Sequence, residues 1–505
     1  MKFKTKVAYS AVLATLSLAA GTAQAAYLSE QGTGQVLLYP YYTVQGGMDT
    51  YVSVTNTTSR GKAVKVRFIE GRGSWEVLDF NLYLSAYDVW NAAVTAVDAA
   101  DANSAAKIVT GDNSCTSPMI PAGGQAFRNG AYIGKTKVGQ DQLSTDLTGL
   151  ARTREGYVEI IEMGVTDNTT KVNGTNPLMP LTFEESITHS TSGANAGKPA
   201  DCAWVNAQFG TLAGNALAPN TLRTTTRTGG LIGTGTLISV KDGLDYTYDP
   251  VAIEDFNSIS TVNLHFIPGS TSPSLADAEP TSVVIDGTGS GRRMIVTDWS
   301  AATPYVRNDP ISAVLQRSAV YNEYTVNTNL AAATDWVVTF PTKRAYVGNS
   351  DANTARPFTK GSPYGVVPSQ YTEVWKACEP ISLEIWDREE LKKQGSVDFS
   401  PAPVTGNALC YEANVLSFGG KNVLGSVNLK NNIADVFQDG WARLTFANNQ
   451  AMTGPDFDAP YTERTYYGLP TIGFAVQKYV NGTFNGSVGN YGGSFIHKYA
   501  RTVAP

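Results

Sequence analysis

The chain has 505 residues, of which 42% are hydrophobic and only 16% are charged, whereas about 25% charged residues is usual for soluble domains. It contains 48 Gly, 24 Pro and 25 Tyr but only 3 His, a composition that favours strands and tight turns. These figures exclude a disordered chain, a coiled coil, a collagen and a polytopic membrane protein. At roughly 150 residues per domain, the length predicts two to four domains.

Residues 1–25 have the organisation of a secretory signal peptide. Three lysines precede an apolar stretch at 7–20, and Ala23-Gln24-Ala25 provides the small-residue cleavage pattern. Loss of the three lysines lowers the formal net charge from −6 to −9, which argues against a nucleic-acid partner. No later stretch reaches the length of about 18 apolar residues that a membrane span needs, so we expect no transmembrane segment once the leader is removed.

Short strands separated by polar turns are predicted for residues 26–165. In residues 63–70, for example, Val64, Val66 and Phe68 alternate with basic residues, as in a strand with one apolar face. The predicted strands are 35–44, 50–55, 63–70, 76–84, 87–94 and 156–163. This pattern indicates an N-terminal β-sandwich, and it leaves Ig-like and jelly-roll arrangements open.

Residues 166–330 are predicted to be a more irregular middle region. Residues 165–200 are rich in Thr, Asn, Ser and Gly, which is typical of a long inserted loop, and strands are predicted at 229–240 and 261–267. A short amphipathic helix is predicted near 309–320, with Asp309 as its N-cap and Pro310 in its first turn.

Residues 331–505 are predicted to form a C-terminal β region. The predicted strands are 335–340, 373–386, 409–418, 441–446 and 471–480. The fold class expected for the whole chain is therefore all-β, a β-sandwich architecture with a few short helices and long inserted loops. The C-terminal region could pack with the N-terminal one.

The four cysteines predict disulfide bonds. An even number of cysteines in an exported chain favours bridges, and four cysteines can pair in three ways. We favour Cys115–Cys202 and Cys378–Cys410, because pairing neighbours in the sequence closes the shortest loops. Their role would be structural, in an oxidising compartment.

The sequence contains no recognisable catalytic motif, so we predict no catalytic, cofactor-binding or metal-binding residue. His189, His265 and His497 are interpreted as surface or structural histidines. No G-x-S-x-G elbow, H-E-x-x-H motif, phosphate-binding loop or dinucleotide fingerprint occurs.

A pair of carboxylates is the remaining route to an enzyme, since glycosidases need two acids about 5–10 Å apart. The candidates are Glu159 with Glu162, Glu184 with Glu185, and the charged run 387–390, which more often marks a solvated turn. Odd spacing sends Glu159 and Glu162 to opposite faces of a strand, so an active pair would have to form between strands.

Two loops leave a structural Ca²⁺ ion open, since extracellular β-proteins can hold Ca²⁺ with carboxylate and carbonyl oxygens. The candidate ligands are Asp242, Asp245, Asp249, Asp456 and Asp458. Neither loop follows the EF-hand pattern.

Aromatic residues raise the question of sugar binding. We expect the tryptophans at strand ends to fill the core, and we leave surface stacking open for a tyrosine cluster near the N-terminus. The tryptophans are Trp90, Trp336 and Trp441, and the tyrosines are Tyr39, Tyr41 and Tyr42.

Residues 34–90, which begin "GQVLLYPYYTVQGG", resemble the start of a group of secreted or cell-surface proteins of Gram-negative bacteria that have no assigned activity. Further similar segments are "AVLQRSAVYNEYTVN", "TDWVVTFPTKRAYV", "LCYEANVLSF" and "DGWARLTF". The resemblance implies export and a composite body in which N- and C-terminal strands pack together. It implies no catalytic residue.

These observations predict an exported, non-enzymatic protein of the cell surface or extracellular matrix that acts through assembly or adhesion. Its expected partners are other copies of itself, other surface proteins or polysaccharide. The alternative is a secreted carbohydrate-active protein that binds glycans or hydrolyses them with a cross-strand carboxylate pair. The expected location is extracellular or at the outer cell surface, with the periplasm as the alternative.

Overall fold

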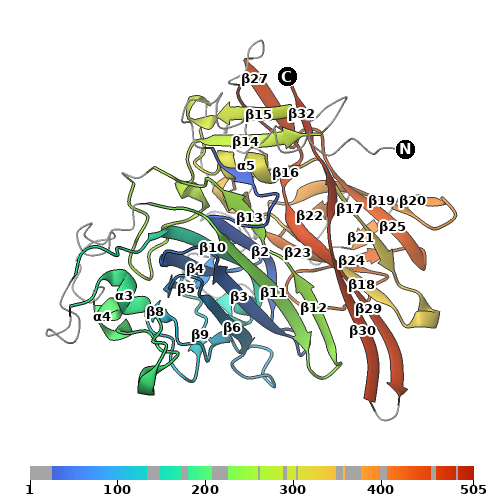
Figure 1. The fold of residues 1–505 in the computed structure, drawn as a ribbon. Coiled ribbons are helices and arrows are strands. Elements are labelled where there is room, and N and C mark those ends of the chain that lie inside the picture. The colour runs from blue at the N-terminus through green and yellow to red at the C-terminus, as the bar shows by residue number, and fades with distance from the viewer. Residues whose placement is uncertain are drawn as a thin grey trace, which may run out of the picture.

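The computed structural model describes residues 25–133, 148–171, 180–207, 226–259, 262–287, 293–302, 305–347, 357–358, 377–394, 396–398, 407–456, 462–484 and 487–505. Strands dominate these residues and the helices are short, so the predicted all-β class is confirmed (Figure 1). The sheets are mainly antiparallel and pack together in the manner of a sandwich. The expected leader lies outside the described residues except for Ala25.

The N-terminal sandwich, blue to green in Figure 1, consists of two sheets. The first runs in the order β1 (Tyr27–Leu28), β13 (Val251–Glu254), β2 (Val36–Thr43), β10 (Glu155–Val165), β4 (Lys62–Glu70), β5 (Glu76–Leu84) and β8 (Cys115–Ser117). The second runs in the order β12 (Leu244–Tyr248), β11 (Leu231–Ser239), β3 (Asp49–Asn56), β6 (Val89–Ala96), β7 (Ala106–Val109) and β9 (Gln125–Ala126).

These two sheets extend beyond the boundary expected at residue 165, because β11, β12 and β13 belong to them. The strand predicted at 229–240 is present as β11, and the packing of β11 requires two of its glycines. A side chain at Gly233 would collide with the hydroxyl of Tyr39, and one at Gly235 would collide with the ring of Tyr248. Glycine therefore lets tyrosines from neighbouring strands approach the backbone of β11 closely.

The C-terminal sandwich, orange to red in Figure 1, also consists of two sheets. The outer one runs in the order β20 (Lys392–Gln394), β19 (Glu379–Trp386), β25 (Asp439–Phe446), β17 (Ala319–Thr325) and β31 (Lys498–Ala500), and β22 (Ala408–Leu409) also pairs with β19. The inner one runs in the order β21 (Ser396–Asp398), β24 (Lys430–Ala434), β23 (Ala413–Phe418), β18 (Ala333–Thr339), β29 (Ile472–Phe484) and β30 (Ser487–Ile496).

Small sheets and a helix, at the top of Figure 1, complete the body. The sheets pair β14 (Thr281–Asp286) with β15 (Arg293–Asp298), β16 (Gln316–Arg317) with β28 (Leu469–Pro470), and β27 (Glu463–Tyr467) with both β26 (Ala451–Pro455) and β32 (Thr502–Ala504). The remaining helical segments are α3 (Phe183–Ile187), α4 (Cys202–Ala207), η1 (Leu150–Arg154), η2 (Gly193–Asn195), η3 (Leu275–Asp277), η4 (Trp299–Ala301), η5 (Thr328–Leu330) and η6 (Lys343–Ala345). Within the described ranges, no helix combines the length and apolar character needed to cross a bilayer.

The helix predicted near 309–320 is present as α5 (Asp309–Leu315), with three corrections. It ends at Leu315, because the residues after it form β16 and β17. Its N-cap is Asn308 rather than Asp309, and Pro310 lies in its first turn. All of its residues are buried, so it is not amphipathic, because it packs against β14 on one side and β28 on another. Asp309 is tolerated there because its carboxylate accepts a hydrogen bond from the hydroxyl of Tyr346 at 2.8 Å.

The strand predicted at 261–267 is an irregular segment in the structure over its described residues, 262–267. Its backbone groups form hydrogen bonds with side chains rather than with a neighbouring strand. Asn81 Nδ2 donates to the carbonyl oxygen of Phe266 at 2.9 Å, and the amide of His265 donates to Asn263 Oδ1 at 2.9 Å.

The inner C-terminal sheet joins the two sandwiches through alternating side chains. Along β18, Val337 belongs to the core of the N-terminal sandwich, whereas Trp336 and Val338 belong to the core of the C-terminal sandwich. Phe474 of β29 lies on the first side and stacks on Tyr248 of β12 at a centroid distance of 4.4 Å. Both faces of the sheet are therefore buried, which explains its continuous apolar runs.

A polar contact between the sandwiches, which we call the joint, is centred on Glu155 at the start of β10. Its carboxylate accepts hydrogen bonds from the hydroxyl of Ser426 at 2.5 Å and from the backbone amides of Val427 and Asn428, both at 3.0 Å. The hydroxyl of Tyr41 donates to the same carboxylate at 2.8 Å. Ser426, Val427 and Asn428 of the C-terminal half are thus held by one buried acid of the N-terminal half.

A pH dependence of stability follows from Asp335 of β18. Burial raises the pKa of its carboxyl group to about 7, although the backbone amide of Leu424 donates to it at 2.9 Å. Because the folded state binds this proton more tightly than the unfolded state does, the free energy of unfolding should fall as pH rises from about 4 to 7, by up to about 4 kcal/mol. Asp335→Asn should remove this contribution and raise stability at pH 8. Urea unfolding at pH 5 and pH 8 checks this, and the same pH dependence in both proteins would contradict it.

Candidate functional site

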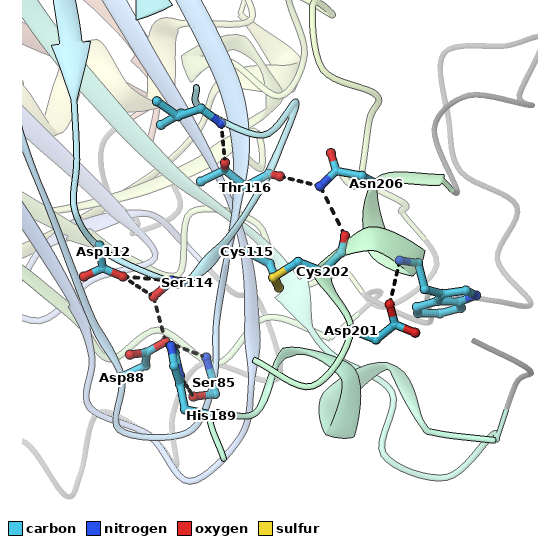
Figure 2. The surroundings of a disulfide bond; sticks show 12 residues. Ser85, Asp88, Asp112, Ser114, Cys115, Thr116, His189, Asp201, Cys202 and Asn206 are labelled. Carbon is cyan, nitrogen blue, oxygen red and sulfur yellow. Dashed lines mark hydrogen bonds and ion pairs between the residues drawn. A yellow bond between two sulfur atoms is a disulfide. The ribbon is translucent and has the colours of Figure 1, made fainter. Parts of the chain in front are cut away.

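Two disulfide bonds are present, and both pairings match the prediction. Cys115, the first residue of β8, bonds to Cys202, the first residue of α4, and Cys378 bonds to Cys410. The first bridge fastens the inserted helices to the edge of a sheet (Figure 2). Asn206 of α4 adds a hydrogen bond from Nδ2 to the carbonyl oxygen of Thr116 at 2.9 Å. The bridges indicate an oxidising compartment outside the cytoplasm.

Beside the first bridge lies a pocket of about 330 Å³, which we call the polar pocket. Three chain segments form it: the turn before β6, the loop after β7 and the segment after α3. Its polar lining consists of Asp88, Asn91, Asp112, Asn113 and His189. Figure 2 shows Asp88 and Asp112 on either side of Ser114.

Ser114 connects the two acids of the polar pocket. Its Oγ atom lies 2.7 Å from Asp112 Oδ1 and 3.2 Å from Asp88 Oδ2. Burial raises the pKa of Asp88, while the neighbouring His189 lowers it and the negative charge of Asp112 raises it further. The pocket thus holds a pair of carboxylates close to each other, and the sequence reasoning missed it because the two acids lie in separate loops.

The same pocket does not contain a catalytic triad. His189 Nδ1 lies 3.4 Å from Ser85 Oγ and 3.7 Å from Asp88 Oδ2. In a triad the acid and the nucleophile face different ring nitrogens: the acid orients the ring through one N–H, and the other nitrogen accepts the proton of the nucleophile. Here both groups face the same nitrogen, and this arrangement cannot activate Ser85.

The other two histidines are buried and hydrogen-bonded. His265 Nε2 lies 2.9 Å from the hydroxyl of Tyr83, and burial lowers the pKa of His265 to about 3. His497 Nε2 donates to the carbonyl oxygen of Val337 at 2.9 Å, and burial lowers the pKa of His497 to about 4. Both rings are therefore neutral at physiological pH.

The carboxylate pairs proposed from the sequence are not brought together as acid and base. Glu159 accepts a hydrogen bond from Arg67 at 2.7 Å, and Glu162 forms an ion pair with Lys62 at 2.7 Å. Each buried acid is thus compensated by its own buried cation, which is a structural arrangement.

The remaining candidates also have structural explanations. Glu184 pairs with Arg60 at 3.0 Å, and Glu185 caps α3 by accepting from the amide of Thr182 at 2.7 Å. In the run 387–390, Asp387 accepts hydrogen bonds from the turn that follows it, which agrees with the solvated-turn interpretation.

The aspartates considered for Ca²⁺ do not converge on a common point. Asp242 pairs with Lys478 at 3.0 Å, and Asp456 pairs with Arg464 at 2.6 Å. Asp458 lies outside the described residues. Within the described part of the chain, no group of three or more His, Cys, Asp or Glu side chains is placed to hold a metal ion.

The aromatic residues correct the sequence analysis most strongly. Trp90 and Trp336 are fully buried, as predicted, but Trp441 is 40% exposed. The tyrosines considered for surface stacking, Tyr39, Tyr41 and Tyr42, are all fully buried, because β2 has packed side chains on both faces.

Trp441 stacks on Trp386 across β25 and β19, with ring centroids 4.1 Å apart and ring planes 7° apart. The pair stands on the outward side of the outer C-terminal sheet, because Ala442 and Ile385 point into the core. The alternation in "GWARLTF" could have indicated that Trp441 faces outward. The buried residues of this strand are Ala442, Leu444 and Phe446, so the residues between them face away from the core. Because Ala442 is small and Trp441 is large, the sequence analysis assigned Trp441 rather than Ala442 to the core.

Charged side chains surround the stacked rings. Arg443 Nε donates to Glu384 Oε2 at 2.9 Å, and Lys392 binds the other oxygen of the same carboxylate. These hydrogen bonds lower the pKa of Glu384. Arg443 and Lys392 also lie over the ring of Trp386, each about 5.3 Å from its centroid. We call Trp386, Trp441, Glu384, Arg443 and Lys392 the tryptophan face.

Among the described residues, the tryptophan face and the polar pocket are two surface features that offer binding groups to a partner. Comparison of the chain with protein-family models, with the curated proteins and with the solved structures found no match.

Proposed function

We propose that this is an exported, non-enzymatic protein of the cell surface or extracellular matrix that acts through adhesion or assembly. The tryptophan face carries the proposal. Tryptophan buries a large apolar area when it is covered, so two stacked rings left at the surface indicate a surface that a partner covers. The partner classes are other copies of the chain, other surface proteins and polysaccharide.

A face suits this role better than a strand edge. β30 is a long edge strand, but its polar groups are partly engaged: Asn322 Nδ2 donates to the carbonyl oxygen of Phe495 at 3.0 Å. Near its other end, the side chain of Asn490 donates to the carbonyl oxygen of Asp242 at 2.7 Å, which places the β11–β12 turn beside the strand. An added strand would have to displace the Asn322 contact, because pairing needs a free row of amides and carbonyls.

Export is supported by the disulfides together with the expected leader, and the resemblance to secreted proteins points the same way. Within the proposal the protein resides outside the cell or on its outer surface, with the periplasm as the alternative. Fractionation of the native host followed by immunoblotting tests this. The protein should be found with washed cells or in the medium, and detection only in the periplasmic fraction would contradict the proposed location.

A second candidate function, glycoside hydrolysis, is favoured by the Asp88–Asp112 pair alone. Two nearby carboxylates in a pocket are what such an enzyme requires. The adhesion proposal predicts that neither the wild-type protein nor Asp112→Asn releases reducing ends from a panel of oligosaccharides. Release by the wild-type protein that is lost in Asp112→Asn would instead assign the hydrolase activity to this pocket.

A further inference from the structure

We propose that the tryptophan face binds a neutral polysaccharide. This inference rests on the proposed adhesive function and names the partner of that surface. It follows from the exposed ring surface, the compensated charges and the hydrogen-bonding groups of the face.

The exposed ring surface is a platform for the apolar side of a sugar ring. Trp386 covers one face of the Trp441 ring, so the 40% of Trp441 that remains exposed belongs to its opposite face and its edges. On the other side of Trp441 the neighbouring strand β17 presents Glu323, which is exposed like Trp441 itself. A ligand can therefore lie against this ring without any rearrangement of the sheet.

Lys392 and Arg443 share Glu384, which leaves one positive charge on the tryptophan face. The exposed Glu323 of β17, in register with Trp441, supplies a second negative charge beside it, and the nearby Lys393 pairs with Asp435 at 2.9 Å. A polyanion-binding surface would instead present several unpaired cations. The charge pattern therefore fits a partner without net charge.

The side chains of Arg443 and Lys392 provide hydrogen-bond donors beside the stacked rings. A guanidinium group has five N–H donors, and Glu384 engages only Nε and one terminal nitrogen of Arg443. The side chains of Arg443 and Lys392 remain about half exposed, at 43% and 50%. Hydroxyl groups beside a sugar ring that lies on Trp441 would meet these donors, whereas a purely apolar partner would leave them unpaired.

Affinity electrophoresis tests this inference with hydroxyethyl cellulose and dextran as neutral probes and alginate as the polyanionic probe. The wild-type protein should be retarded by a neutral probe, and Trp441→Ala should weaken that binding by about tenfold or more, as expected for a central tryptophan contact. Trp441→Phe should restore part of the binding, because it keeps an aromatic ring. Tyr51→Ala is the matched control, since Tyr51 is 39% exposed on the N-terminal sandwich and should bind like the wild type.

Thermal unfolding of each variant shows whether it is folded, and only folded variants are compared. Retardation by alginate alone, equal binding by Trp441→Ala and wild type, or no retardation by any neutral probe would each overturn the inference. A dimer in light scattering that Trp441→Ala dissociates would assign the face to a second copy and would also overturn it. If one of these results is found but the wild-type protein is retained on host cells, only the polysaccharide inference is wrong. If the wild-type protein is also not retained on host cells, the proposed adhesive function is wrong as well.

Discussion

Replacing Arg152 with leucine is expected to lower the free energy of unfolding by about 3–5 kcal/mol, the usual effect of leaving one member of a buried ion pair without its partner. Arg152 and Glu70 are both buried, and two nitrogens of Arg152 lie 2.7 and 3.2 Å from the two oxygens of the Glu70 carboxylate. Leucine removes the positive charge and leaves the carboxylate in the interior. Urea unfolding at pH 7 measures the loss.

The double variant Arg152→Leu/Glu70→Gln provides the control, because it removes the orphaned negative charge as well. Glutamine retains an oxygen for the backbone amides of Arg72, Gly73 and Trp75 that now donate to Glu70. The double variant should therefore be more stable than Arg152→Leu alone. A single variant within about 1 kcal/mol of the wild type would show that this pair is solvated, contrary to the burial described above.

Gly425→Ala is expected to destabilise the protein by about 3 kcal/mol, through backbone strain and through a collision. Gly425 has a φ of +65°, and a Cβ atom there would lie 2.5 Å from the Cα atom of Gly46. Gly46, in the turn between β2 and β3, has a φ of +61°. Two glycine turns, one from each sandwich, thus touch backbone to backbone beside the joint.

Gly420→Ala separates the two causes. Its φ is +71°, but a Cβ atom there has no neighbouring atom within 4 Å, so it has only the strain of a left-handed alanine, about 1–2 kcal/mol. Chemical denaturation of both variants should show a clearly larger loss for Gly425→Ala. Equal losses of unfolding free energy in the two variants would mean that the contact between Gly425 and Gly46 can open without destabilising the protein.

Strands whose side chains alternate clearly could be predicted, whereas other strands, such as β14, β15 and β17, were not. In β3, Val52 and Val54 are buried while Tyr51 is exposed, which is the period of two that the sequence shows. β2 and β18 lack such alternation, because each separates two cores and is buried on both faces. Their continuous apolar runs still identified them as strands.

The parts that depend on distant segments could not be predicted. The polar pocket combines Asp88, Asp112 and His189 from three loops, and no spacing in the sequence relates them. The joint depends on Glu155 meeting residues 426–428, more than 260 positions away. Such placements follow from packing of the sheets, which a pattern of neighbouring residues does not encode.

The tryptophan face was within reach of sequence reasoning but was misread. We expected Trp441 in the core because large aromatic residues usually fill it. The alternation of β25 instead places Ala442, Leu444 and Phe446 inside. In this strand the phase of the alternation outweighs the size of a single side chain.

Retention of the purified protein on washed host cells tests the adhesive role of the tryptophan face most directly. The wild-type protein and Tyr51→Ala should be retained to the same extent, whereas the folded double variant Trp386→Ala/Trp441→Ala should lose most of its retention, by about tenfold or more. Equal retention of the double variant and the wild type would contradict the account.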